Sequence, residues 1–244
     1  MQTITFCTVG ETAALTHARN ALRSWGYTVY PELTDTATHI LLPAPSLDAN
    51  GHIHGGPALQ ALLQTMPQDA TLIGGMLPKL ALTYIDLLED PYYLAENAAI
   101  TAHCAVRIAM NQLDRTLDQL PVLIIGWGRI GKCLAQLLRN MGANVTVATR
   151  SREQQAMLQA LGYTAISIPN IQAEEFALIL NTAPAPVLDC GNSASNSLFI
   201  DLASQPGLIG GKVLWERGLP NRYSPASSGL LMAKTALRYA LRKE

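Results

Sequence analysis

The sequence predicts an α/β protein built from two doubly wound parallel-sheet domains, Rossmann-like or flavodoxin-like, that are joined by a long helix. Short runs rich in β-branched residues alternate with amphipathic stretches rich in alanine and leucine along the chain. Its 244 residues are enough for two modest domains. One sustained helical pattern separates two such alternating halves, with apolar residues repeating at four-residue spacing.

These patterns predict the domain boundaries. Residues 1–92 form a first α/β domain, residues 93–120 the linking helix, and residues 121–228 a second α/β domain. Asp90-Pro91 can start the linking helix, because Asp caps well and Pro is tolerated in the first turn. The last helix, within residues 229–244, is free to pack back on the first domain.

The elements of each domain follow from the same alternation. Strands of the first domain are expected at Ile4–Val9, Tyr27–Tyr30, His39–Leu42 and Thr71–Gly74, with helices at Thr12–Trp25 and Pro57–Met66. Strands of the second are expected at Val122–Ile125, Asn144–Ala148, Ala165–Ser167, Leu178–Asn181, Leu198–Asp201 and Gly211–Leu214. The expected helices are Tyr93–Leu117, Ile130–Met141, Glu153–Gly162 and Gly229–Arg242.

Composition excludes several functional classes. A net charge of −1 gives no electrostatic footprint for nucleic acid. The sequence shows no signal-peptide pattern and no apolar run of about 20 residues, so we expect a soluble, cytoplasmic protein without membrane association. Four scattered cysteines without a C-x-x-C pair favour reduced thiols over disulfides or a zinc site.

The stretch VLIIGWGRIGKCLAQLL indicates a nucleotide-binding turn. It places G-x-G-x-x-G at Gly126, Gly128 and Gly131, between an apolar strand and an amphipathic helix. The first glycine permits the tight turn, the second lets the backbone approach a pyrophosphate, and the third allows close helix packing. The helix N-terminus then faces the anion. The predicted contacts in this turn are Gly126, Trp127, Gly128, Arg129, Ile130 and Gly131.

The next strand ends without the acidic residue that usually binds the ribose hydroxyls of NAD. Thr149 stands there, followed by Arg150, Ser151 and Arg152. An acid would repel a 2′-phosphate, whereas two guanidinium groups and two hydroxyls can bind one. The alternative is a solvated helix start, but two cations at a helix N-terminus oppose the macrodipole unless an anion lies between them. We therefore predict a preference for NADP over NAD.

Two further loops are expected beside the nicotinamide. NTAPAP follows the fourth strand of the second domain, and DLASQPG follows the fifth. Either loop could also be an ordinary connection. The predicted cofactor contacts in the first of these loops are Asn181, Thr182, Ala183 and Pro184.

Histidine supplies the candidate for acid–base chemistry. His103 lies on the linking helix beside Thr101 and Cys104, and an imidazole can exchange a proton near neutral pH. A histidine packed at a domain boundary is the alternative. His52 and His54 lack a third ligand, so we expect a solvated loop there and no metal site.

Several segments together resemble the dipicolinate synthase A family, the nucleotide-binding component of that enzyme. They are ENAAITAHCAV, IIGWGRIGKCLAQLLRNMGANVTVATRS, LILNTAP, FIDLASQPG and GLPNRYSPASSGLL, in that order, from about Glu96 to the C-terminus. The resemblance implies an N-terminal α/β domain, a linking helix and a C-terminal Rossmann domain. It also implies oxidation of dihydrodipicolinate with NADP, in the last step to the dipicolinic acid of bacterial spores, together with a flavoprotein-like second subunit.

The chain departs from the family pattern on the expected substrate side. Where the family has T-x-E-G on the linking helix, this chain has Thr101, Ala102, His103 and Cys104. The family's G-L-P-G-x-x-A-P-K becomes GLPNRYSPA, with Ser227 where lysine is usual. A short helix and linker after Gly207 are also missing. The cofactor half therefore matches the family better than the substrate half.

The resulting hypothesis is an NADP-dependent oxidoreductase acting on a small diacid, in a homo-oligomer. His103 is the candidate base and Ser204 a second candidate catalytic residue, while the candidates for holding substrate carboxylates are Ser46, Thr101, Arg222 and Ser227. One alternative is a D-2-hydroxyacid dehydrogenase, but no histidine follows Pro121. The other is a non-catalytic NADP-binding regulatory or partner subunit.

Overall fold

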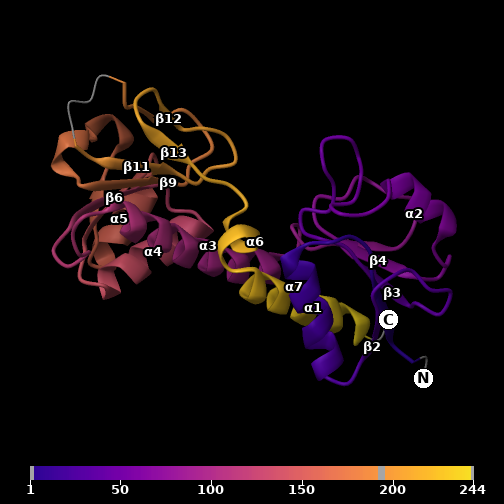
Figure 1. Cartoon of the computed structure of the whole chain (residues 1–244). Coiled ribbons are helices and arrows are strands. Elements are labelled where there is room, and N and C mark those ends of the chain that lie inside the picture. The colour runs from indigo at the N-terminus through magenta and orange to yellow at the C-terminus, as the bar shows by residue number, and fades with distance from the viewer. Residues whose placement is uncertain (1–2, 192–195, 243–244) are drawn as a thin grey trace. The chain divides into compact units, whose positions relative to one another are not determined.

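The computed structural model describes residues 3–191 and 196–242 (Figure 1). The chain divides into two compact units, which are considered separately below. Unit 1 comprises Met1–Asn97 and Pro220–Glu244, and unit 2 comprises Ala98–Leu219. Each unit is built on a parallel sheet with helices, so the predicted α/β class with two doubly wound domains is confirmed.

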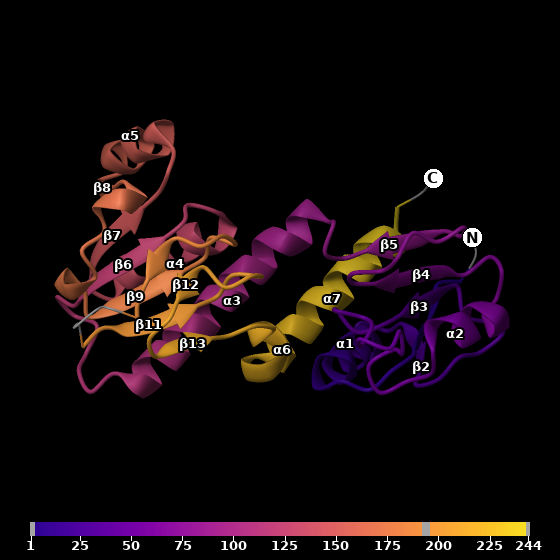
Figure 2. The same cartoon turned by 90° about the horizontal axis from the view of Figure 1, so that it is seen from above.

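Unit 1 contains a parallel sheet in the order β2-β1-β3-β4-β5, which is the flavodoxin-like order (Figure 2). Its strands are β1 (Thr5–Thr8), β2 (Thr28–Tyr30), β3 (His39–Leu41), β4 (Thr71–Gly74) and β5 (Tyr84–Asp86). Its helices are α1 (Ala13–Ser24), α2 (Leu59–Thr65) and α7 (Pro225–Ala240), with the short α6 (Leu219–Tyr223) at its boundary. The sequence patterns did not predict β5 or α6.

The usual ligand crevice of unit 1 is occupied by its own chain. In a sheet of this order, ligands bind outside the carboxyl ends of β1 and β3, where the winding reverses. Here the loop of residues 46–57 crosses that point. The Glu11 N–H donates to the His54 carbonyl (2.9 Å), and a Cβ placed on Gly10 would meet that carbonyl oxygen at 2.7 Å. The loop therefore crosses the switch point at Gly10 and Glu11, and a cavity remains beside it, next to the residues that follow β1 and β2.

Helix α7 packs against α1 in unit 1, and both views show the two helices side by side (Figures 1 and 2). Gly229 allows the close approach, because a Cβ there would collide with the Ala14 carbonyl and meet the His17 Cβ at 2.6 Å. The helix begins at Pro225, one turn earlier than the predicted Gly229, because Pro is well suited to a first helical turn.

Asp90 links the start of helix α3 (Pro91–Gln112) to the last turns of α7. Its carboxylate accepts the Tyr93 N–H (2.7 Å) and the Tyr239 hydroxyl (2.6 Å), and lies 2.7 Å from an Arg238 guanidinium nitrogen. Burial opposes ionisation, but these three partners outweigh it and hold the pKa of Asp90 below its usual value. The capping role predicted for Asp90-Pro91 is present.

Removing the Asp90 carboxylate should destabilise unit 1 in a pH-dependent way. Asp90→Ala is expected to lower the free energy of unfolding by about 1–3 kcal/mol at neutral pH, because a carboxylate that accepts two hydrogen bonds and forms an ion pair is lost. A depressed folded-state pKa contributes stability that is present above the unfolded-state pKa and lost as pH falls through the folded-state value. Urea unfolding should therefore show the stabilities of variant and wild type approaching each other as the pH falls below the usual carboxyl pKa. Asp35→Ala, at an exposed carboxylate, should change stability little at either pH.

Unit 2 contains a parallel sheet in the order β13-β11-β9-β6-β7-β8, which is the strand order 3-2-1-4-5-6 of a dinucleotide-binding Rossmann domain, reversed. Its strands are β6 (Pro121–Ile125), β7 (Asn144–Ala148), β8 (Thr164–Ile166), β9 (Leu178–Asn181), β11 (Leu198–Asp201) and β13 (Val213–Trp215). Two short strands, β10 (Leu188–Asp189) and β12 (Leu208–Ile209), pair separately. Its helices are α4 (Arg129–Asn140) and α5 (Arg152–Ala160), with single turns at Ile168–Asn170 and Ala173–Glu175.

The long helix α3 crosses from one unit into the other. It ends at Gln112, not at the predicted Leu117, and the chain then turns through residues 113–120 before β6. Leu117 is nevertheless buried, which explains why its apolar spacing continued the helical pattern in the sequence. Among residues 3–191 and 196–242, no helix combines the length and apolarity that crossing a membrane requires.

Candidate nucleotide-binding site

The glycine turn lies at the point where the winding of the unit 2 sheet reverses. Gly126 follows β6 with φ of +102°, in the left-handed region that favours glycine. Its N–H donates to the Ala148 carbonyl (2.9 Å), and the Thr182 N–H donates to the Ile125 carbonyl (2.8 Å). These bonds bring the ends of β7, β6 and β9 together. The residues predicted to contact a dinucleotide thus come from adjacent strand ends.

The three glycines differ in what surrounds them. A Cβ on Gly131 would collide with the Gly126 carbonyl, and one on Gly126 would meet the Thr182 hydroxyl at 2.6 Å. Both positions therefore need glycine for packing. A Cβ on Gly128 would meet nothing within 4 Å, so open space remains where a pyrophosphate would approach the backbone.

The N-terminus of α4 is suited to an anion. Gly128 is its N-cap, no side chain caps it, and its first turn contains no acidic residue. The first amides of the helix are therefore available to phosphate oxygens, and the helix dipole favours negative charge there. This arrangement of glycines and uncapped amides fits a dinucleotide pyrophosphate.

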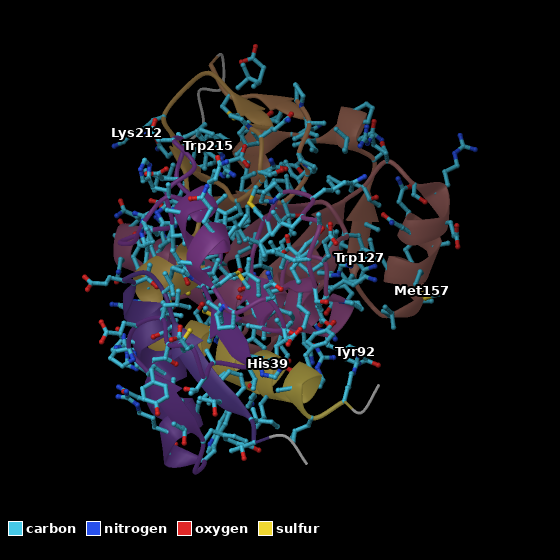
Figure 3. The ribbon with its side chains drawn as sticks, turned by 90° about the vertical axis from the view of Figure 1, so that its right-hand side faces the viewer. His39, Tyr92, Trp127, Met157, Lys212 and Trp215 are labelled. Carbon is cyan, nitrogen blue, oxygen red and sulfur yellow. The ribbon has the colours of Figure 1, made fainter. Side chains whose placement is uncertain are left out.

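The Trp127 side chain, inside the glycine turn, packs against other side chains of unit 2. Its ring lies 5.7 Å from that of Tyr163 in an edge-to-face arrangement, and Lys132 Nζ lies 5.9 Å from its centre. The Arg139 guanidinium covers the Tyr163 ring at 4.1 Å. The Trp127 side chain (labelled in Figure 3) is thus used in packing, which leaves its backbone for contact with a ligand.

Two arginine side chains after β7 have no partner within the described part of the chain. Arg150 and Arg152 are exposed, and neither forms a hydrogen bond or ion pair within the described part of the chain. The Ser151 hydroxyl caps α5 by accepting the Gln154 N–H at 3.2 Å. Since that hydroxyl still has its own proton to donate, Ser151 can cap the helix and bind an anion together.

Thr149 is less available than its neighbours. It is buried, and its hydroxyl donates to the Gln154 side-chain oxygen at 2.6 Å. Gln155 donates to its carbonyl at 2.9 Å. Of the four residues predicted to surround a 2′-phosphate, Thr149 therefore shapes the strand end, whereas the two arginines and Ser151 present donors.

The loops after β9 and β11 form one hydrogen-bonded assembly. Asn181 is fully buried, and its amide donates to Asp201 (2.9 Å) and to the Ala183 carbonyl (3.1 Å). Its side-chain oxygen accepts the Ala183 N–H (3.0 Å). The Thr182 hydroxyl donates to the Ile125 carbonyl at 3.0 Å, so the predicted loop of residues 181–184 is fixed at the reversal point.

Asp201 is a residue of this site that motif reasoning did not single out. Four N–H donors surround it, and it is fully buried. The signal was present in the sequence, since Asp201 begins DLASQPG at the end of a strand. Ser204 lies in the same loop and is exposed, and the Trp215 indole (labelled in Figure 3) donates to the Ala203 carbonyl at 3.0 Å.

The residues predicted to bind substrate are distributed over both units. His103 is exposed on α3 and Thr101 is buried on the same helix, both in unit 2. Arg222 lies on α6 and Ser227 in the first turn of α7, and both side chains are exposed.

Ser46 has its hydroxyl committed within unit 1. The residue is fully buried; its hydroxyl donates to the Pro43 carbonyl (2.8 Å) and accepts the Gly75 N–H (2.9 Å). A ligand carboxylate would have to displace the Pro43 bond. This geometry favours a structural use of Ser46, which the sequence could not reveal because both partners are backbone groups.

The Asn221 side chain, on α6, also forms hydrogen bonds within unit 1. It donates to the Ala44 carbonyl (2.7 Å) and accepts the Ser228 hydroxyl (2.8 Å). These bonds tie α6 and the start of α7 to the loop after β3 within unit 1.

Thiol chemistry has no support at the buried cysteines. Burial raises the pKa of the Cys7 thiol to about 12, and burial with the nearby Asp189 and Asp201 charges raises the pKa of Cys190 to about 11. Because the thiolate is the nucleophile, both side chains are unreactive near neutral pH.

Two cavities lie away from the nucleotide position. One of about 1010 Å³ in unit 2 borders Gln112, Pro121 and Ala177, at the amino ends of the strands and thus at the opposite edge of the sheet. One of about 420 Å³ in unit 1 borders Gly10, Glu32 and Leu62, beside the residues that follow β1 and β2 and next to the loop of residues 46–57. Dinucleotides bind at the carboxyl ends of such sheets, so the first cavity is not the cofactor site.

Comparison with known proteins agrees with this geometry. Residues 101–186 match the model of the D-isomer specific 2-hydroxyacid dehydrogenase, NAD binding domain. Dipicolinate synthase A of Bacillus subtilis (strain 168) is 26% identical over 157 residues, covering 62% of this chain. The chain resembles dipicolinate synthase A. The matched stretch spans 53% of that relative's length.

Solved structures show the same fold. The crystal structure of dipicolinate synthase A from Bacillus halodurans has a TM-score of 0.86 and 21% identity, covering 100% of both chains. The corresponding dipicolinate synthase structure from Bacillus subtilis gives 0.80 and 19%, covering 98% of this chain and 97% of that one. A transhydrogenase from Sinorhizobium meliloti gives 0.68 and 15%, covering 96% and 93%. These likenesses show the fold, while residues 101–186, within unit 2, are the part that matches a dehydrogenase NAD-binding domain.

Proposed function

We propose that this protein is an NADP-dependent oxidoreductase that resembles dipicolinate synthase A and oxidises dihydrodipicolinate to dipicolinate. The observation that carries the cofactor part is the pair of exposed, unpartnered cations at the end of β7, Arg150 and Arg152, beside the uncapped N-terminus of α4. Bound NADP would supply the hydride acceptor. The chain would supply the pyrophosphate cradle, the 2′-phosphate donors and a base.

The likeness to dipicolinate synthase A supports the substrate class, a spore-forming context and cooperation with a second, flavoprotein-like subunit. A small diacid needs cationic or hydroxyl donors, and Thr101, Arg222 and Ser227 remain our candidates for its carboxylates. Ser204 is proposed to face the reacting ring from the loop after β11. Ser46 is a weaker candidate because its hydroxyl already has two partners.

His103 is our proposed base, and the length of α3 supports its position in unit 2. Gln112, at the end of α3, borders the same cavity as Pro121, at the amino end of β6. Residues 113–120 join the helix to the strand, and we propose that the two run in opposite directions. Nine helical residues rise about 13 Å, and five strand residues extend about 16 Å. His103 should therefore lie near the level of the carboxyl end of β6.

The test is formation of NADPH from NADP and dihydrodipicolinate, with and without a flavoprotein-like partner. Turnover in either condition supports the enzyme. Tight NADP binding without turnover in both conditions would favour the non-catalytic regulatory or partner subunit.

The match to the 2-hydroxyacid dehydrogenase model supports a second candidate function, the oxidation of a D-2-hydroxyacid. That model covers the nucleotide-binding part, and no histidine follows Pro121 to act on a hydroxyacid from the Rossmann unit. Oxidation of small D-2-hydroxyacids, measured in parallel with NADP and NAD, distinguishes this alternative from the first.

A further inference from the structure

Asp201 is surrounded by donors from two separate loops. Its Oδ1 accepts the Ala203 N–H (2.9 Å) and the Asn181 side-chain amide (2.9 Å). Its Oδ2 accepts the Gly207 N–H (2.7 Å) and the Leu208 N–H (2.9 Å). Each carboxylate oxygen thus accepts two hydrogen bonds. Because the side chain is fully buried, water does not weaken these bonds.

These four bonds control both loops that flank the nicotinamide side of the reversal point. Three backbone donors fold residues 203–208 around the carboxylate, and the fourth donor belongs to the loop after β9. Gly207 completes the junction, because a Cβ there would collide with the Asn181 amide and meet the Ala185 and Ala183 carbonyl oxygens at 2.6 and 2.8 Å. The Asp201 side chain therefore links the two loops, so that neither moves without the other while these bonds hold.

We infer that Asp201 is a positioning residue that holds the loops of residues 181–185 and 203–208 in the arrangement that receives the nicotinamide half of the cofactor. The inference rests on the proposed function, since it requires a dinucleotide in unit 2. Asp201 itself is enclosed and need not touch the ligand. The adenine half is held at the end of β7, by other residues.

Asp201→Asn is the substitution that tests this role most directly. Asn is nearly the same size, but one of its two terminal atoms is an NH₂ donor. Whichever way the amide turns, that NH₂ faces two N–H donors where the carboxylate offered an acceptor. The loops must then open at either the Asn181 side or the Gly207 side, whereas the strands and the glycine turn keep their own bonds.

The experiment compares binding of NADP with binding of adenosine 2′,5′-bisphosphate, which lacks the nicotinamide half. Asp201→Asn should raise the Kd for NADP about tenfold or more, since an unsatisfied buried donor costs about 1–3 kcal/mol. The Kd for the fragment should change less than twofold. If the wild type prefers NAD, then NAD and ADP serve as the pair. Gly207→Ala, which leaves the carboxylate intact, should give the same selective loss and covers the case in which Asp201→Asn does not fold.

Asp86 offers a matched control in unit 1. It also ends a strand, and its carboxylate accepts the Met76 (3.1 Å), Leu77 (2.8 Å) and Leu88 (2.8 Å) N–H groups. Asp86→Asn makes the same chemical change away from the Rossmann unit, so it should lower thermal stability while leaving both Kd values unchanged.

Each outcome is decisive. Equal weakening of dinucleotide and fragment in the unit 2 variants, or no weakening at all, would overturn the positioning role and leave the proposed function standing. Failure of the wild type to bind either dinucleotide would overturn the proposed function, and the inference with it.

Discussion

Exchanging Arg150 for aspartate should reverse the nucleotide preference of this protein. The wild type is expected to bind NADP more tightly than NAD, and the variant to bind NAD more tightly than NADP. Arg150 is exposed, and no residue in the described part of the chain pairs with it, so its charge is available to a 2′-phosphate. An aspartate at the same place would repel that phosphate and accept the ribose hydroxyls instead.

The size of the effect follows from the bonds that are lost. A hydrogen bond to a charged group contributes about 1.5–3 kcal/mol, so one or two guanidinium contacts correspond to a change of one to four decades in the NADP-to-NAD affinity ratio. Changing Arg152 as well should extend the shift, because it lies in the first turn of α5 on the same segment. Titration calorimetry with both cofactors measures the ratio directly.

Arg115 provides the control. It is in the same unit and changes the net charge by the same amount when replaced by aspartate, but it borders the cavity at the amino ends of the strands. Arg115→Asp should leave both affinities unchanged. An NADP affinity unaffected by Arg150→Asp and by the double variant would contradict the 2′-phosphate assignment.

His103→Asn is expected to reduce turnover on dihydrodipicolinate by about 10²–10⁴-fold, the usual contribution of a general base. The Kd for NADP should stay within about twofold, because the nucleotide half is bound by the glycine turn and the β7 end. The pH profile provides a further test. Removal of a general base should change the shape of the pH–rate profile, so the profiles of variant and wild type should differ.

His52→Asn is the matched control for His103. His52 is exposed on the loop of residues 46–57, so its replacement should leave both turnover and the pH profile unchanged. A His103 variant with wild-type turnover would remove the base assignment. It would leave cofactor binding untouched.

The sequence predicted the Rossmann unit well because its signals are local. A glycine turn between strand and helix, and regular β-branched runs, each depend on neighbouring residues. The order of both sheets follows the doubly wound pattern that the alternation of strands and helices indicated. The nucleotide turn therefore lies where its spacing placed it.

What the sequence missed depends on long-range partners. The Ser46 hydroxyl is hydrogen-bonded to the backbone of Pro43 and Gly75. The Thr149 hydroxyl is bonded to the Gln154 side chain. Residue type alone predicts none of these bonds. The DLASQPG motif marked the position of Asp201, but its donors lie up to 20 residues away, so its four bonds are seen only in the fold. Strand β5 is no shorter than the predicted β2 and β3, but no helix separates it from β4, so the alternation of strands and helices did not indicate it.

The crossing of the unit 1 switch point by the loop of residues 46–57 has a consequence for stoichiometry. Two doubly wound sheets would ordinarily offer two nucleotide crevices, but the Glu11 amide is already bonded to His54 where a phosphate would approach the first of them. Each polypeptide should therefore saturate with one equivalent of dinucleotide, bound through unit 2.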